Sequence, residues 1–110
     1  MRFDHLAIPV SDVHSVMSWF KEIYPDTEIL YADDEWCFLL VGETKLAFVQ
    51  ENLHPSHFAL VVSPSELQKL SEKYDQEIEQ PREDMLSFYV TGPEGVCIEF
   101  VSYLKDFNDG

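Results

Sequence analysis

A short segment that occurs twice constrains this chain more than any other feature. HLAIPVS begins at His5 and HFALVVS begins at His57, 52 residues later. Two further pairs of segments match at nearly the same spacing: CFLLVG (37–42) with SFYVTG (87–92), and LAFV (46–49) with IEFV (98–101). The chain of 110 residues is therefore predicted to consist of two copies of one structural unit, about 1–52 and 53–104.

In each copy the pattern of apolar residues predicts a strand, a helix and three further strands. Every second residue from Leu6 to Val10 is apolar, which indicates a strand with one buried face. Ser11 is the predicted N-cap of the first helix and Ser63 that of the second. Neither copy can close a core alone. We therefore expect a single α+β domain, in which two tandem β-α-β-β-β modules form a cupped eight-stranded mixed sheet with the helices on the outside.

Composition restricts the partners and the location that can be expected. The chain has 21 acidic and 7 basic residues, which argues against nucleic acid and anionic membranes, since both require clustered Lys and Arg. No apolar run approaches the ~20 residues of a membrane span, and the N-terminal residues lack the layout of a signal peptide, so we expect a cytoplasmic protein. In that reducing compartment Cys37 and Cys97 are expected to be free thiols.

Strand alternation places three ionisable residues on the face opposite the helices: His5, His57 and Glu99. In the last strand Ile98 and Phe100 continue the apolar face, which turns Glu99 to the other side. Two imidazoles and one carboxylate on rigid strands are a ligand set for a divalent metal with open positions for a substrate. Zn, Fe, Mn, Ni and Co all suit these ligands. The alternative is a hydrogen-bonded polar cluster without a metal.

Other side chains are expected on the same face. Tyr89 is a candidate catalytic residue, with plain packing as the alternative. Lys45 is a candidate anchor for an anionic substrate group, or a lysine that reaches solvent. Ser87 and Tyr89 are expected on this inward face. At an offset of 50, Cys37 and Leu39 are their counterparts in the first copy. His14 and His54 are expected to be solvated. The predicted substrate-binding set also includes Trp36, Ala47, Ser87 and Cys97, with buried apolar packing as the alternative for Cys97.

The repeat, the two H-x-A-[IL]-x-V strands and the stretch GPEGVCIEF resemble the vicinal oxygen chelate superfamily. The resemblance extends from Phe3 to about Tyr103, and GPEGVCIEF is similar to a D-P-x-G-N-x-[IL]-E-[LF] hairpin of that superfamily. Its members include glyoxalase I, fosfomycin-resistance thiol transferases, extradiol dioxygenases, methylmalonyl-CoA epimerase and metal-free bleomycin-binding proteins. The resemblance implies that His5, His57 and Glu99 occupy metal positions on the first, fifth and eighth strands.

Ala47 departs from the pattern of this superfamily, because many members carry a further glutamate ligand at its position. Glyoxalase I and the epimerase have two His and two Glu, and they need that carboxylate as a base. Two His and one Glu resemble the set of the fosfomycin-resistance enzymes and the dioxygenases. The resemblance therefore implies a homodimeric, metal-dependent lyase, dioxygenase or thiol transferase acting on a small molecule chelated through adjacent oxygens. The alternative is a non-catalytic small-molecule-binding protein of the bleomycin-resistance type.

Overall fold

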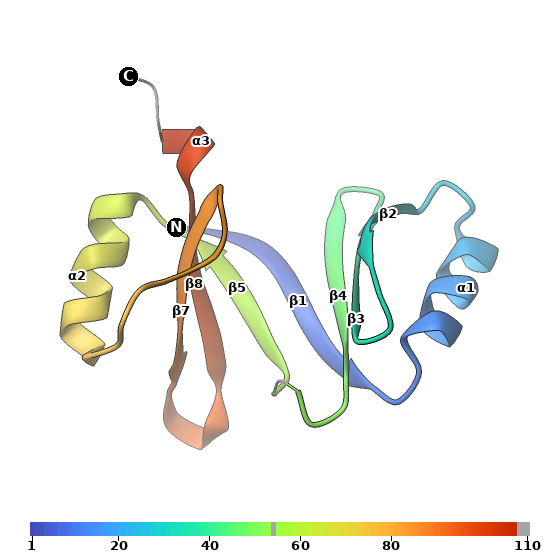
Figure 1. Cartoon of the computed structure of the whole chain (residues 1–110), viewed down its shortest axis with the longest axis horizontal. Helices are drawn as coiled ribbons and strands as arrows, with labels where there is room; N and C mark the ends of the chain where they lie inside the picture. The colour runs from blue at the N-terminus through green and yellow to red at the C-terminus, as the bar shows by residue number, and fades with distance from the viewer. Residues whose placement is uncertain (54, 108–110) are drawn as a thin grey trace. The chain divides into compact units, whose positions relative to one another are not determined.

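The computed structural model describes residues 1–53 and 55–107 (Figure 1). Its elements are β1 (Arg2–Val10), α1 (Val13–Ile23), β2 (Glu28–Ala32), β3 (Trp36–Val41), β4 (Thr44–Gln50), β5 (His57–Val61), α2 (Pro64–Tyr74), β6 (Glu79–Arg82), β7 (Met85–Thr91), η1 (Pro93–Gly95), β8 (Cys97–Tyr103) and α3 (Leu104–Phe107). The order β-α-β-β-β occurs twice, and the strands form an eight-stranded mixed sheet, which confirms the predicted α+β fold. His54, predicted to be solvated, lies outside the described residues.

The chain divides into two compact units, which we name by their place in the sequence. The N-terminal unit comprises residues 5–57, and the C-terminal unit comprises residues from 58 onward together with residues 1–4. The strand order is β2-β3-β4-β1 in the first module and β5-β8-β7-β6 in the second. In both modules the first strand pairs in parallel with the last, and the other pairs are antiparallel. The repeat in the sequence is thus also a repeat in topology.

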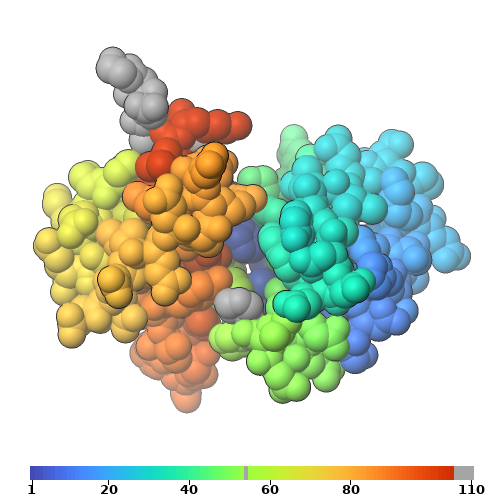
Figure 2. Space-filling view, viewed as in Figure 1, coloured from blue at the N-terminus to red at the C-terminus, as the bar shows by residue number. Residues whose placement is uncertain are grey.

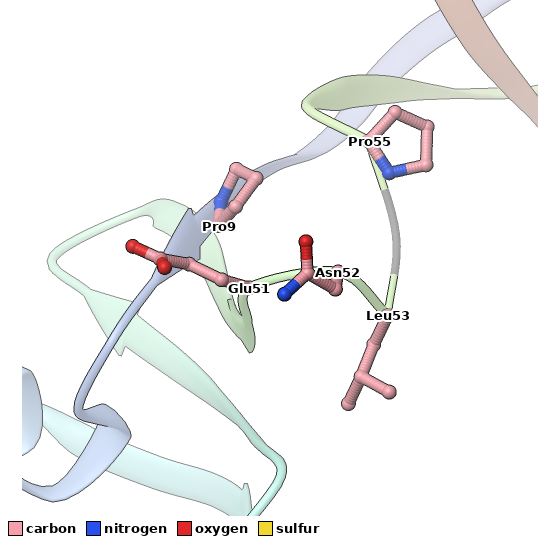
Figure 3. A pocket seen from close by; sticks show the side chains of 5 residues that line it. All are labelled: Pro9, Glu51, Asn52, Leu53 and Pro55. Carbon is pink, nitrogen blue, oxygen red and sulfur yellow. The ribbon is translucent and has the colours of Figure 1, made fainter.

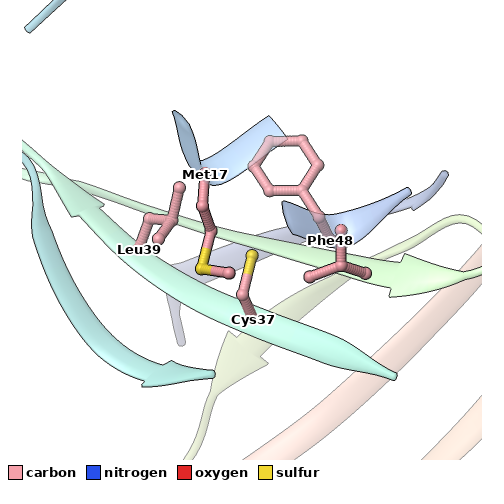
Figure 4. Close-up of a cluster of buried hydrophobic side chains, with 5 residues drawn as sticks. Met17, Cys37, Leu39 and Phe48 are labelled. Atoms are coloured by element: carbon pink, nitrogen blue, oxygen red, sulfur yellow. The ribbon is translucent and has the colours of Figure 1, made fainter. Parts of the chain in front are cut away.

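In the N-terminal unit, α1 covers one face of its sheet. The apolar stripe of the helix packs on side chains from β3 and β4 (Figure 4). The buried cluster consists of Val13, Met17, Cys37, Leu39 and Phe48. Full burial of a side chain of the Leu or Met class contributes about 1.5–3 kcal/mol, so this cluster is a main source of stability for the unit. The opposite face of the sheet carries a second, smaller cluster of Ala7, Phe38 and Ala47.

The facing of β3 differs from the prediction. Cys37 and Leu39 were expected on the face opposite the helix, but both lie under α1, and Phe38 lies on the opposite face with Ala7 and Ala47. The reason is that WCFLLV is apolar throughout, so no alternation in the sequence indicates its faces. Register decides instead, because Phe38 pairs with Ala47 on β4. A shift of one residue along a strand turns every side chain to the other face.

The N-cap of the first helix lies one residue later than predicted. The N-cap is Asp12 rather than Ser11, and its Oδ1 accepts a hydrogen bond of 3.1 Å from the backbone N–H of Ser15. A second bond from Ser15 Oγ, at 2.8 Å, and the backbone bond hold the pKa of Asp12 below its usual value. The cap of α2 is confirmed, because Ser63 Oγ accepts from the backbone N–H of Glu66 at 3.2 Å.

In the C-terminal unit, α2 packs on β7 and β8 in the same manner. Leu67 from the helix meets Val62, Phe88 and Phe100, which form the buried cluster on this face. The sheet face opposite α2 carries a smaller cluster of Ala59, Met85 and Val101. Both helices therefore cover the sheet face that strand alternation predicts for β1, β5 and β8.

At the surface of the N-terminal unit, α1 and β2 appear in blue to cyan in Figure 2. These two elements carry exposed apolar side chains, namely Trp19, Ile23, Ile29, Leu30 and Tyr31. His14 is exposed, as predicted, and its Nε2 lies 2.9 Å from a carboxylate oxygen of Asp34. Within the described part of the chain, none of the helices combines the length and the apolarity needed to cross a membrane.

Candidate metal centre

Two buried histidines of the N-terminal unit lie next to each other. His5 comes from β1 and His57 from the start of β5, and they are 9% and 5% exposed. Their ring centroids are 6.1 Å apart, and one ring nitrogen of each lies within 4.8 Å of the other. A tetrahedral ion with metal–nitrogen bonds of about 2.0–2.1 Å places two ligand nitrogens about 3.3 Å apart. The rings therefore need to approach by at most about 1.5 Å to share one ion.

The backbone before β5 orients His57. Its Nδ1 lies 3.0 Å from the carbonyl oxygen of Pro55, and a carbonyl only accepts hydrogen bonds, so Nδ1 carries the proton. In the neutral ring the lone pair then resides on Nε2, which is the atom that can ligate a metal. A backbone acceptor on the second ring nitrogen is the usual support of a metal-binding histidine. This contact fits the proposed use of His57 as a ligand.

An aromatic side chain packs against His5. The ring of Phe38 meets His5 edge to face with centroids 5.2 Å apart. The row continues outward, since Trp36 lies 6.2 Å from Phe38 and stacks on Tyr31 at 4.5 Å. The hydroxyl of Tyr31 donates to a carboxylate oxygen of Asp33 at 2.6 Å. Trp36 packs against the cluster of Ala7, Phe38 and Ala47 on the face opposite α1, and its role in substrate binding stays a prediction. Apolar walls strengthen electrostatic interactions beside them, because they exclude water.

The neighbouring strand β4 places Ala47 and Lys45 on the same face. β4 runs parallel to β1, with Ala7 paired to Ala47 and His5 paired to Lys45. Ala47 is buried beside Ala7 and offers no ligand atom, at the position where a further carboxylate was considered. The register puts Lys45 beside His5, as the strand parity predicted. A role of Lys45 in holding an anionic group stays a prediction.

Glu99 lies in the C-terminal unit, at the middle of β8, and is 5% exposed. Its two cross-strand neighbours are Ala59 on β5 and Tyr89 on β7. The phenol of Tyr89 and the carboxylate of Glu99 therefore belong to directly paired residues on neighbouring strands. Burial, and then the negative charge of Glu99, raise the pKa of Tyr89 well above its ordinary value. Tyr89 is therefore a neutral donor throughout the physiological pH range.

The other predicted residues of the C-terminal unit are buried near Glu99 on the two strands. Ser87 pairs with Val101, and Cys97 pairs with Thr91 at the start of β8. Cys37 and Cys97 are both free thiols, as predicted, and burial raises the pKa of Cys37. The assignment of Ser87 and Cys97 to substrate binding stays a prediction.

Two residues of the site were not found from the sequence. The carbonyl group of Pro55 orients His57, and no side-chain pattern signals such a backbone contact. Phe38 packs on His5, and nothing in the sequence signalled it. Only the register of β3 and β4, which pairs Phe38 with Ala47, places it on this face.

A hollow at the surface of the N-terminal unit is separate from these residues. It has a volume of about 450 Å³ and opens to solvent at the end of β1 (Figure 3). Its lining consists of Pro9, Glu51, Asn52, Leu53 and Pro55. None of the predicted site residues lines it, so the candidate centre does not belong to this hollow.

Comparison with known proteins identifies the fold. No protein-family model and no curated protein matches the chain. Among solved structures, a glyoxalase/bleomycin resistance protein/dioxygenase superfamily member from Vibrio splendidus 12B01 is 16% identical with a TM-score of 0.68, and the match covers 92% of this chain and 98% of that one. The E323L mutant of homoprotocatechuate 2,3-dioxygenase from Brevibacterium fuscum is also 16% identical with a TM-score of 0.68, over 94% of this chain but 32% of that one.

A third solved structure has a different name. A protein described as an NAD-dependent benzaldehyde dehydrogenase from Legionella pneumophila is 12% identical with a TM-score of 0.60, over 89% of this chain and 96% of that one. At these identities the likeness shows the fold and not the activity. The predicted resemblance to vicinal oxygen chelate proteins is thus confirmed at the level of the fold.

Proposed function

We propose that this chain, which has the fold of glyoxalase/bleomycin resistance/dioxygenase proteins, is an enzyme that binds a divalent metal through His5, His57 and Glu99. The observation that carries the proposal is the buried histidine pair, with ring nitrogens within 4.8 Å and with His57 oriented by a backbone carbonyl. The substrate is proposed to be a small molecule held through adjacent oxygens. The activity is that of a lyase, a dioxygenase or a thiol transferase, in a cytoplasmic homodimer.

Strand pairing supports Glu99 as the third ligand. On β5 the Cα partner of Glu99 is Ala59, and His57 lies two residues before Ala59. Residues two apart on a strand point to the same face, so the side chain of His57 projects to the same face of β5 as that of Ala59. A buried carboxylate is unfavourable unless a cation or hydrogen bonds compensate its charge. Two imidazoles and one carboxylate leave a divalent ion with a net positive charge, which favours an anionic oxygen ligand.

The residues around the three ligands have separate proposed roles. A divalent ion supplies Lewis-acid stabilisation of negative charge on coordinated oxygens. Ala47, being too short to ligate, leaves room for the substrate on the sheet face that it shares with His5. Lys45 anchors an anionic group and Tyr89 assists the reaction. Trp36, Ser87 and Cys97 complete the proposed binding surface.

Metal content tests this function directly. Tag-free protein is incubated with Zn, Fe, Mn, Ni or Co salts, freed of unbound ion by gel filtration, and analysed by mass spectrometry. The wild type is expected to retain about one ion per chain, and His57→Ala is expected to lose it. His14→Ala is the matched control, because His14 is a surface histidine paired with Asp34. Circular dichroism verifies that each variant is folded.

Two results contradict the metal-dependent function. One is a wild-type protein that retains none of the five ions. The other is equal metal content in the wild type and His57→Ala. Glu99→Gln then tests the third ligand separately, since glutamine keeps the shape of the side chain but loses the charge.

A metal-free small-molecule-binding protein is the second candidate. The aromatic row of Tyr31, Trp36 and Phe38 favours it, because stacked rings bind planar apolar ligands without a metal. The chain has two tryptophans, so Trp19→Phe leaves Trp36 as the only fluorescent indole. Quenching of Trp36 by aromatic ligands in the presence of EDTA, unchanged in His57→Ala, supports this candidate. Quenching that requires the metal supports the first.

A further inference from the structure

Tyr89 has a defined partner in the structure, and this partner is the proposed metal ligand. β7 and β8 are antiparallel, and their register sets Tyr89 directly opposite Glu99. Glu99 is buried and Tyr89 is half-buried, and the negative charge of Glu99 acts on the phenol. The other cross-strand neighbour of Glu99 is Ala59, whose methyl group cannot donate a hydrogen bond. Of these two neighbours, only Tyr89 can orient the carboxylate through its side chain.

The internal repeat provides a comparison within the same chain. On β4 the counterpart of Glu99 is Ala47, and the residue paired with Ala47 is Phe38. The same cross-strand position therefore holds a tyrosine opposite the glutamate and a phenylalanine opposite the alanine. The two aromatic rings differ by one hydroxyl group. That hydroxyl is present in the module that has a carboxylate to receive it, and absent in the other.

A carboxylate has two oxygens, and a buried one turns about its terminal bond unless a donor holds it. A phenol that donates to one oxygen leaves the second oxygen with a fixed direction. Such outer contacts typically change metal affinity by 10–100-fold when they are removed.

We propose that Tyr89 is a positioning residue, whose hydroxyl holds one oxygen of Glu99 so that the other is presented to the metal. This inference rests on the proposed function, since it assigns a role around the same ion. It replaces direct participation in the reaction, which was the expectation for Tyr89, by action through Glu99. The sheet register supplies the geometry, and the hydroxyl supplies the hydrogen bond.

The test compares Tyr89→Phe with Tyr103→Phe, a matched control. Tyr103 is on β8, and its hydroxyl donates to the carboxylate of Asp4 at 2.8 Å, so each variant removes a phenol hydroxyl beside a carboxylate. Affinity for Co²⁺ is measured by titration, and the visible spectrum of the bound ion reports its coordination. We expect Tyr89→Phe to weaken binding by 10–100-fold and to change the spectrum. Tyr103→Phe is expected to leave the affinity and the spectrum close to those of the wild type, because Tyr103 is not paired with Glu99.

A double-mutant cycle separates positioning from a general structural effect. If Tyr89 acts through Glu99, adding Tyr89→Phe to Glu99→Gln causes little further loss of Co²⁺ affinity. An equal loss in both backgrounds overturns the inference, and so does wild-type affinity with an unchanged spectrum in Tyr89→Phe. Both of these outcomes leave the metal-dependent function standing. A wild-type protein that binds no Co²⁺ overturns the function and the positioning role together, so the wild-type arm distinguishes the two failures.

Discussion

Ser102 provides a quantitative test of the packing in the C-terminal unit. Its side chain is 0% exposed, and its Oγ has no hydrogen-bond partner among the described residues. Its Cα partner on β7 is Leu86, which packs against the apolar cluster under α2. Burial of a hydroxyl group without a hydrogen bond costs about 1–3 kcal/mol in proteins. Removing the oxygen also removes its van der Waals contacts, but that loss offsets only tenths of this gain. Ser102→Ala is therefore expected to raise the free energy of unfolding by about 1 kcal/mol.

The free energy is measured by urea unfolding followed by circular dichroism, together with the thermal midpoint. For a chain of this size about 1 kcal/mol corresponds to a rise in Tm of roughly 4 °C. Thr27→Val is the control, because the hydroxyl of Thr27 is also buried but donates to the carbonyl of Tyr24 at 2.7 Å. Thr27→Val is expected to lower the free energy of unfolding by about 1 kcal/mol. If Ser102→Ala is destabilised to the same extent, Ser102 makes a hydrogen bond and the reasoning is wrong.

Three further predictions concern charge, capping and thiol reactivity. Burial and the Asp4 carboxylate raise the pKa of Tyr103 above its ordinary value, so its contribution to stability is complete below about pH 10 and declines as the pH rises further. Urea unfolding at pH 8 and 11 measures this decline. A smaller decline in Tyr103→Phe than in the wild type attributes it to Tyr103. Asp12→Ala is expected to lower Tm more than Ser11→Ala, since Asp12 caps α1; the reverse order contradicts this cap. Cys37 is buried, and burial raises its pKa, so it should react with a thiol reagent only as fast as the protein unfolds. Rapid reaction of Cys37 in native buffer contradicts its place under α1.

The faces of β1, β5 and β8 were predictable because a histidine or glutamate on each strand, His5, His57 or Glu99, is unfavourable on the apolar face under a helix. Leu6, Ile8 and Val10 on β1 repeat an apolar residue every second position, and burial of one face then turns His5 to the other. β3 has no histidine or acidic residue to mark one of its faces, and its facing was predicted from similarity between CFLLVG and SFYVTG. That alignment was one residue away from the pairing that the sheet adopts. Hydrogen bonds between strands select the register, and similarity of apolar residues does not.

The residues of the candidate site were easier to predict than the contacts that orient their side chains. His5, His57 and Glu99 were recognisable because buried ionisable residues are rare in apolar strands. The contact between His57 and Pro55 was not recognisable, because it involves a backbone carbonyl whose position depends on the path of the chain before β5. The placement of Tyr89 opposite Glu99 depends likewise on which residues of β7 and β8 are paired.

The amino-acid sequence by itself determined the two β-α-β-β-β modules, the helix-covered faces of the alternating strands and the side chains that can ligate a metal. These follow from local periodicity and from a repeat, and both are properties of residue order. The tertiary structure alone decided the N-cap at Asp12, the facing of β3 and the partners of His57 and Glu99. Each of these depends on strand register or on a backbone atom, and many registers of an apolar strand bury similar surface. Only the assembled sheet, where every backbone hydrogen bond must be satisfied at once, selects one of them.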